Sequence, residues 1–193
     1  MVLSIAIGGA GYRCKRTFSD PEGLLYTIGR GGEQIPALVK YTDPNFFRLF
    51  EFEFLDGKPF WEADVASGLR KVVLSDRMAR RIFGRTDVVG QTFKQDFKES
   101  KVVGVVREGS YLLPASYGQI YMPYSCLPGY DKNNDGSHKV GTYVVYFKVR
   151  QKEDMPKLYA EVNELVRKYN TSQKEYTVDI FHQPDPYWQT WFR

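Results

Sequence analysis

Residues 71–84 read KVVLSDRMARRIFG, a short apolar strand followed at once by a helix. Lys71 to Leu74 favours a strand because most of its side chains are β-branched or aliphatic. Ser75 is a preferred residue at a helix N-terminus, and the Asp76 carboxylate suits the positive end of the helix dipole. Gly84 is a typical residue just after a helix. Because no G-x-S-x-G pattern surrounds Ser75, we expect it to cap the helix and not to act as a nucleophile.

The residues before this stretch predict a helix and then a strand rich in phenylalanine. Asp43-Pro44 supplies a capping carboxylate followed by proline at the first helical position. From residue 50 to residue 54, phenylalanine alternates with Glu51 and Glu53, which is typical of a strand with one solvated face. This strand should end at the turn Asp56-Gly57. Three more strands are predicted, at Ile35 to Tyr41, Gln91 to Phe97 and Lys101 to Val106.

The last third of the chain predicts a strand, a helix and a second strand. Thr142 to Val149 is rich in β-branched and aromatic residues, and Glu175 to Phe181 alternates between apolar and polar residues. Between them, Asp154 can cap a helix whose apolar residues fall on one face. Those residues are Met155, Leu158, Tyr159, Val162, Leu165, Val166 and Tyr169. A strand–helix–strand unit of this length suggests a right-handed crossover packed on a mixed sheet.

Composition excludes several classes of protein. The 193 residues carry a formal net charge of +4, with no basic run longer than Arg80-Arg81, so a nucleic-acid partner is not predicted. No apolar stretch approaches the roughly 18 residues that cross a bilayer, and the first residues lack a signal-peptide pattern, so we expect this fragment to be soluble. Cys14 and Cys126 either form one long-range disulfide or remain two free thiols. An aromatic content of 16% suffices for a large core and for contact surfaces.

An oxygen-rich loop carries the sharpest local motif. Asp131, Asn133 and Asp135 occupy positions 1, 3 and 5 of a calcium-binding loop, and Gly136 occupies position 6. Position 12, however, is Thr142 where such loops have a bidentate glutamate. The alternative is a plain solvated loop.

No catalytic constellation is visible in the sequence. His138 and His182 lie in predicted loops without metal-ligand spacing. Glu51 and Glu53 share one strand face, but alternation with phenylalanine favours a solvated face over a catalytic pair. We therefore predict neither an enzyme nor a cofactor.

From Tyr41 onward, five segments follow the order and spacing of a known family. They are Tyr41 to Phe50, Phe54 to Phe60, Val72 to Gly84, Asp87 to Phe93 and Lys101 to Val106. Together they resemble the MacB-like periplasmic core domain, which is found in ABC transporter permeases that also carry an FtsX-like membrane module. The glycines and phenylalanines of these segments look like markers of the fold, at turns and in the core.

The resemblance implies a domain inserted between the first two transmembrane helices of a permease, on the periplasmic side of the bacterial inner membrane. Its fold would be α+β, a mixed sheet with a C-terminal strand–helix–strand unit and an inserted, mostly-β lobe. Residues 1–42 plus 140–193 would form a membrane-proximal, porter-like subdomain, and residues 43–139 the lobe. The implied role is non-catalytic, the relay of ATP-driven stalk motion to exported substrate or partner proteins.

The same resemblance implies the partners of the chain. They are the transmembrane helices of the same permease, a second permease copy, a separate cytoplasmic ATPase and a periplasmic partner protein. A different function also stays open, a stand-alone extracellular binding module, dependent on calcium if the loop at 131–136 binds the ion.

Two groups of aromatic residues are candidates for contacts. One is a tyrosine-rich stretch, whose predicted partner-contact residues are Tyr117, Tyr121, Tyr124 and Tyr130. The alternative is that this stretch packs on its own domain. The other group lies near Arg193 and suits a membrane interface or a terminal helix docked on the sheet. Its members are Trp188, Trp191 and Phe192.

Overall fold

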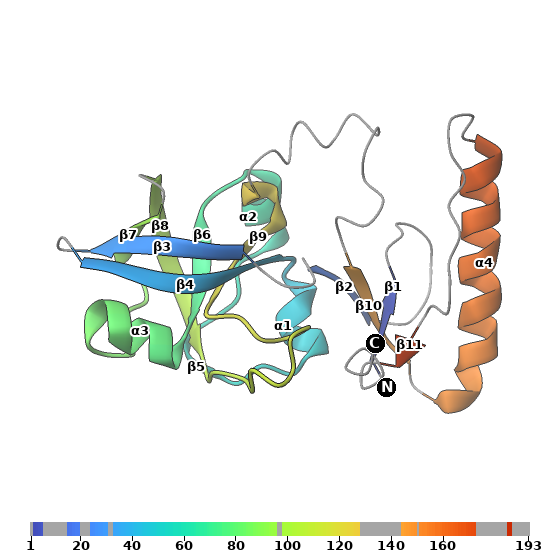
Figure 1. Cartoon of the computed structure of the whole chain (residues 1–193), viewed down its shortest axis with the longest axis horizontal. Coiled ribbons are helices and arrows are strands. Elements are labelled where there is room, and N and C mark those ends of the chain that lie inside the picture. The colour runs from blue at the N-terminus through green and yellow to red at the C-terminus, as the bar shows by residue number, and fades with distance from the viewer. Residues whose placement is uncertain are drawn as a thin grey trace.

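The computed structural model describes residues 2–5, 15–19, 24–30, 33–95, 98–127, 144–149, 151–172 and 185–186. These residues form a mixed sheet with helices, the fold class that the sequence predicts. The helix at Glu62–Ala66 and the strand at Ile120–Pro123 are not among the predicted elements. Figure 1 shows two bodies. The larger is built around residues 24–127, and the smaller combines the first and last strands with a long C-terminal helix.

Six strands of the larger body close into a barrel. They are β3 (Leu24–Arg30), β4 (Glu33–Thr42), β6 (Lys71–Ser75), β7 (Thr92–Gln95), β8 (Lys98–Val106) and β9 (Ile120–Pro123). Hydrogen bonds join them in the order β4-β3-β7-β8-β6-β9, and β9 also pairs with β4. The pairs β6–β8 and β4–β9 are parallel and the others antiparallel. In this ring each strand pairs with a neighbour on both sides over part of its length, which reduces the strand edge available for pairing with other chains.

The main core draws side chains from every strand of this ring. Along β4, the buried residues Ile35, Ala37, Val39 and Tyr41 alternate because successive side chains of a strand point to opposite faces. Other strands contribute Ile28, Val72, Leu74, Phe93, Val102, Ile120 and Met122. Helix α3 (Asp76–Phe83) packs Met78, Ala79 and Ile82 on the same core.

The predicted caps of two helices are confirmed. At α3, the Met78 N–H donates to Ser75 Oγ over 3.2 Å, and Gly84 ends the helix with φ of 75°. At the short helix α1 (Asn45–Leu49), the Phe46 N–H donates to Asp43 Oδ1 over 3.0 Å. The local sequence predicts where both helices begin, because a capping side chain bonds an N–H only three residues further along the chain.

A second cluster consists largely of aromatic rings from α1 and the segment after it. Its buried members are Phe46, Phe47, Phe60, Val65, Val73, Val106 and Tyr121, with Phe50, Phe52 and Phe54 packed against them. The predicted strand across residues 50–54 is wrong in extent, since β5 (Phe54–Gly57) begins only at Phe54. Glu51 has φ of 56° and the Phe52 N–H donates to Phe47 O over 2.9 Å, so the chain turns there.

The smaller body has the strand order β11-β1-β10-β2. Its strands are β1 (Val2–Ile5), β2 (Lys15–Ser19), β10 (Val144–Lys148) and β11 (Asp185–Pro186). Because β10 and β11 both pair antiparallel with β1, they run parallel with β1 between them. Helix α4 (Met155–Ser172) follows β10 as predicted, and its Leu158 and Val162 cluster with Val149. The predicted strand Glu175 to Phe181 lies outside the described residues.

The two bodies share one hydrogen-bonded sheet path. The link is the pairing of Ser19 on β2 with Thr42 on β4. Strands β3 and β4 belong to the barrel through their pairing with β7 and β9. The domain boundary between residues 42 and 43 stays a prediction. Strands β3 and β4 precede this boundary in the sequence but pair with strands of the barrel that follow it.

Candidate functional site

The junction between the two bodies is the candidate functional site. Tyr146 of β10 is buried against Leu49 at the end of α1 and Ala115 of the loop that precedes β9. The ring of Phe50 meets the Tyr146 ring edge-on, with centroids 5.2 Å apart and planes at 72°. These four residues form an apolar contact between segments that lie far apart in the sequence.

An ion pair lies beside this contact. Lys148 Nζ donates to Glu51 Oε1, and both groups are partly open to solvent. Along β10, Tyr146 and Lys148 share one face, and Phe147 and Val149 share the other, where they cluster with α4. The smaller sheet is therefore covered by α4 on one side and by the larger body on the other, which ties the two bodies together.

The loop over residues 107–119 is anchored by a buried lysine. Lys40 is fully buried on β4, and its Nζ donates to Pro114 O at 2.7 Å and to Ala115 O at 3.1 Å. Burial of an ammonium group is costly unless its donors are satisfied, so these bonds fix the loop backbone at the junction. In the sequence, Lys40 stands beside buried apolar residues with no local signal that it is buried.

The start of the same loop is fixed to α3. Ser75 Oγ donates to Glu108 Oε2 over 2.7 Å, and the Glu108 N–H donates to Asp76 Oδ1 over 3.0 Å. Burial raises the pKa of Asp76, but the hydrogen bonds from Glu108 N–H and Arg80 outweigh it and lower that pKa below its usual value. Ser75 is fully buried, and its hydrogen bonds join the start of the helix to the loop.

The predicted contact tyrosines occupy different environments. The prediction that Tyr121 makes partner contacts at the surface is wrong. This residue is fully buried, and its Oη donates to Ser116 O over 3.1 Å. Burial raises the pKa of Tyr121 far above its usual range and also raises that of Tyr117. Tyr117 and Tyr124 are half-buried, and Tyr124 packs against both core clusters. Tyr130 lies outside the described residues.

Several other predicted site residues also lie outside the described residues. They are Asp131, Asn133, Asp135, Trp188, Trp191 and Phe192. Within the described part of the chain, no group of three or more histidine, cysteine or acidic side chains could hold a metal ion. Cys126 is a half-buried free thiol whose pKa is raised by burial, whereas Cys14 is not described.

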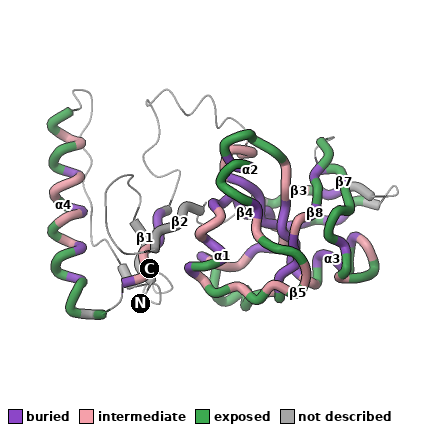
Figure 2. The backbone as a smooth tube through the Cα atoms, turned by 180° about the vertical axis from the view of Figure 1, so that it is seen from behind, coloured by how far each residue is buried: buried purple, intermediate pink, exposed green. Residues whose placement is uncertain are grey.

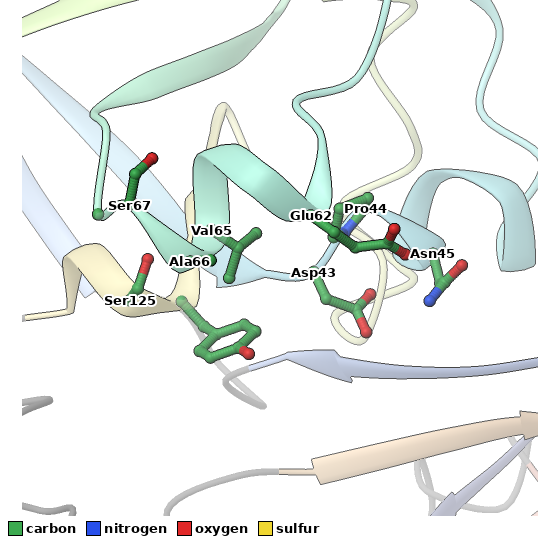
Figure 3. A pocket seen from close by; sticks show the side chains of 10 residues that line it. Asp43, Pro44, Asn45, Glu62, Val65, Ala66, Ser67 and Ser125 are labelled. Atoms are coloured by element: carbon green, nitrogen blue, oxygen red, sulfur yellow. The ribbon is translucent and has the colours of Figure 1, made fainter.

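A pocket of about 590 Å³ opens beside α1, between α2 (Glu62–Ala66) and the 3-10 turn η1 (Tyr124–Cys126). Figure 3 shows Asp43, Glu62 and Asn45 toward one end of it, with Ser67 and Ser125 at the other. The Asp43 carboxylate already caps α1. The described lining residues include two serines and two carboxylates but no histidine or lysine.

A buried carboxylate near this pocket is also structural. Asp64 accepts hydrogen bonds from Lys71 Nζ at 2.6 Å and from the Trp61 N–H at 2.8 Å. Burial raises the pKa of Asp64, but the two hydrogen bonds and the Lys71 charge together lower it below the usual value.

Within the part of the chain that the structure describes, no helix is long and apolar enough to cross a membrane.

Comparison with known proteins places this architecture in a family. The profile of the MacB-like periplasmic core domain matches residues 16–165, which is most of the chain. The match includes the barrel, the junction and the first part of α4.

Two curated relatives are permeases. The chain is 20% identical over 146 residues to the uncharacterized ABC transporter permease YknZ of Bacillus subtilis (strain 168), which covers 76% of this chain and 35% of that protein. It is 25% identical over 105 residues to the macrolide export ATP-binding/permease protein MacB of Shewanella sp. (strain W3-18-1), covering 53% of this chain and 16% of that protein. The chain thus matches about a third or less of the length of these relatives.

Solved structures share the fold. The periplasmic region of MacB from Actinobacillus actinomycetemcomitans has a TM-score of 0.60 at 17% identity, covering 79% of this chain and 66% of that one. The extracellular domain of the transporter YknZ from Gram-positive bacteria also has a TM-score of 0.60, at 19% identity, with 84% and 80% covered. A domain of a putative permease protein from Porphyromonas gingivalis has a TM-score of 0.65 at 16% identity, with 96% and 91% covered.

The profile match, the permease relatives and the shared mixed α+β fold agree with the five motif segments of the sequence. The chain belongs to the MacB-like periplasmic core domain family, the periplasmic domains of ABC transporter permeases.

Proposed function

We propose that this chain is a non-catalytic relay, which carries ATP-driven motion of a permease from the membrane to an exported substrate or a partner protein. The observation that carries the proposal is the pairing of the first and last described strands. Leu3 of β1 lies opposite Pro186 of β11 in an antiparallel pair, so the chain enters and leaves this pair at the same end. A domain inserted between two transmembrane helices needs its two connections side by side.

The junction supports a relay in which both bodies move together. Tyr146, Phe50 and Leu49 make a packed contact, and Lys148 with Glu51 adds an ion pair beside it. Packed interiors resist compression and transmit displacement as rigid units. A shift of β1 and β11, imposed by the membrane helices, would therefore carry the barrel with it.

In this proposal, β1, β2, β10, β11 and α4 form the membrane-proximal, porter-like subdomain, and the barrel with its aromatic cluster forms the inserted lobe. The pairing of β3 and β4 with barrel strands favours a lobe that begins near residue 24, not at residue 43. The partners would be the transmembrane helices of the same permease, a second permease copy, a separate cytoplasmic ATPase and a periplasmic partner protein.

Distance measurements between spin labels test the relay. The complete permease would be assembled with its ATPase in lipid nanodiscs, with Cys14 and Cys126 replaced by serine. Labels at Arg81→Cys on α3 and Asn163→Cys on α4 report on the two bodies, since both positions are exposed. We expect the distance between these labels within one domain to stay constant when nucleotide is added. The distance between matching labels in the two permease copies should change.

Two outcomes would contradict the relay. One is a domain whose internal distance changes with nucleotide, because the two bodies would then move separately. The other is a distance between copies that nucleotide leaves unchanged. The stand-alone calcium-dependent module makes a different prediction, a rise of the melting temperature with calcium that a chelator reverses.

A further inference from the structure

Gln95, the last residue of β7, is a buried side chain whose amide has no partner. It is 1% exposed, and neither its Nε2 nor its Oε1 forms a hydrogen bond. A polar group that is buried and unpaired costs free energy, so most buried polar groups in folded proteins are paired with the chain, with water or with a ligand. Gln95 therefore points to a group that binds next to it.

Strand pairing places Gln95 beside a cationic and a hydroxyl side chain at one end of the barrel. Across the β7–β8 ladder it lies opposite Lys98, and Ser100 is the next residue of β8 on the same face. On its other side it lies opposite Ile28, whose side chain is in the core, so this face points inward. Buried and exposed residues alternate along β7 and over residues 99–102 of β8 (Figure 2), as in a wall between core and solvent.

Arg70, just before β6, reaches the same end of the barrel from the other side of β8. Its Nε donates to Ser100 Oγ over 3.3 Å, and its O accepts from the Lys101 N–H over 2.9 Å. The thiol of Cys126 lies close by. Burial raises the pKa of Cys126, whereas the charges of Arg70 and Lys98 act to lower it, so both cations lie near one sulfur atom.

Arg70, Gln95, Lys98 and Ser100 form a group that we call the barrel-end cluster. Within the described part of the chain, no aspartate or glutamate forms an ion pair with Arg70 or Lys98. A guanidinium presents a planar fork of donors that matches carboxylate and phosphate groups, and hydrogen bonds to such ions are stronger than those between neutral groups. Two cations and an amide donor therefore favour an anion as the ligand.

We propose that the barrel-end cluster binds an oxyanion, a carboxylate or phosphate group, where β7 ends and β6 and β8 begin. Gln95 Nε2 and the two cations donate to the anion, and Lys98 is also the donor for Gln95 Oε1. Lys98 is exposed and Arg70 half-buried, so the anion enters from solvent past flexible side chains and Gln95 forms the buried floor. The site lies within the barrel and needs no motion of membrane helices, so it holds or fails independently of the relay.

Nuclear magnetic resonance of the isotope-labelled chain tests the site directly. The side-chain amide resonance of Gln95 is identified by its absence from the spectrum of Gln95→Met. Inorganic phosphate then replaces sodium chloride at constant ionic strength, so that general salt effects stay the same. We expect the Gln95 resonance to shift saturably. The melting temperature should rise by about 2–4 °C at a phosphate concentration about five times the dissociation constant.

Substitutions separate binding from a structural role. Gln95→Met, Arg70→Met and Lys98→Met should each lose most of the phosphate-dependent rise in melting temperature. Without phosphate, Gln95→Met should melt no lower than the parent chain, because an apolar side chain of similar length replaces an unpaired amide. Lys101→Met is the matched control and should keep the full response, since Lys101 is exposed on the opposite face of β8.

A second anion identifies the source of the oxyanion. Acetyl-diglycine carries a carboxylate at the end of a peptide, and its binding is compared with that of inorganic phosphate. Tighter binding of the peptide would assign the site to a carboxylate of a partner protein, and tighter binding of phosphate to a free phosphate ion.

Two outcomes would overturn the proposal. One is a Gln95 resonance that phosphate and acetyl-diglycine both leave unchanged, because water would then suffice as the partner of the amide. The other is an equal response in the parent chain, the three variants and the control, because the effect would then be that of salt on the whole chain.

Discussion

Gly57 is a position at which the fold leaves no room for a side chain. Its φ is 66°, in the left-handed region, and a Cβ built on it would lie 2.2 Å from Val103 O. Gly84, just after α3, has a similar φ of 75° but no heavy atom within 4 Å of the same Cβ position. An alanine at Gly84 would therefore meet backbone strain alone, whereas an alanine at Gly57 would meet backbone strain and steric overlap.

Gly57→Ala should destabilise the protein more than Gly84→Ala. Left-handed backbone strain predicts a cost of about 1–2 kcal/mol at Gly84, and overpacking raises the expected cost at Gly57 to about 2–5 kcal/mol. Urea unfolding of both variants measures the difference. Equal losses would show that the β5–β8 contact relaxes around the new methyl group.

The buried carboxylate of Asp64 predicts acid sensitivity. Its pKa is lower in the folded state than in the unfolded chain, so its contribution to stability is present above the unfolded pKa of about 4 and is lost as the pH falls through the folded value. In Asp64→Asn, the free energy of unfolding should fall less steeply with decreasing pH below about 4. Denaturant titrations over this pH range measure the slope, and a slope identical to that of the parent chain would exclude this role.

Among the elements, α3 joins the barrel core to the loop over residues 107–119. Its cap, Ser75 Oγ, accepts from the Met78 N–H and donates to Glu108 Oε2, so one hydroxyl serves the helix and the loop. Ser67, after α2, instead donates to Ala63 O from an exposed position. The two serines make a matched pair for substitution.

Ser75→Ala should lower the free energy of unfolding by about 1–2 kcal/mol, because the cap is lost and Glu108 loses a donor while largely buried. Ser67→Ala should change it by less than about 0.5 kcal/mol. Thermal and chemical unfolding compare the two variants. A cost at Ser67 equal to that at Ser75 would argue against the cap as the cause.

At the scale of the whole molecule, we expect the junction to make the two bodies move as one unit. The described contacts include a single strand pairing, the aromatic contact of Phe50 with Tyr146, and the Lys148–Glu51 ion pair. The ion pair is partly exposed and contributes little, so the buried Tyr146 ring is expected to carry most of the coupling.

Tyr146→Ala should uncouple the two bodies. Removal of a buried aromatic ring costs about 3–5 kcal/mol, and here the loss falls on the contact between bodies. We expect one cooperative thermal transition in the parent chain and two in the variant, followed by near-UV and far-UV circular dichroism. Tyr111→Ala, at a 73% exposed position, is the control and should keep one transition. A single transition in Tyr146→Ala would show that the bodies are held together elsewhere.

By itself, the sequence determined the features that depend on neighbouring residues or on family motifs. The caps at Ser75 and Asp43, the end of α3 at Gly84 and the span of α4 depend on residues a few positions apart, so they were readable before folding. The order of five motif segments was enough to predict the family.

Only the tertiary structure decided the closure of the barrel, the burial of Tyr121 and Lys40, and the junction at Tyr146. Each depends on contacts between segments far apart in the chain, as in the bond from Lys40 Nζ to Pro114 O. Periodicity shows which residues share a face but not which distant segment covers that face. The burial of Lys40 and Tyr121 therefore depends on the pairing of β9 with β4 and on the contact of the preceding loop with β4.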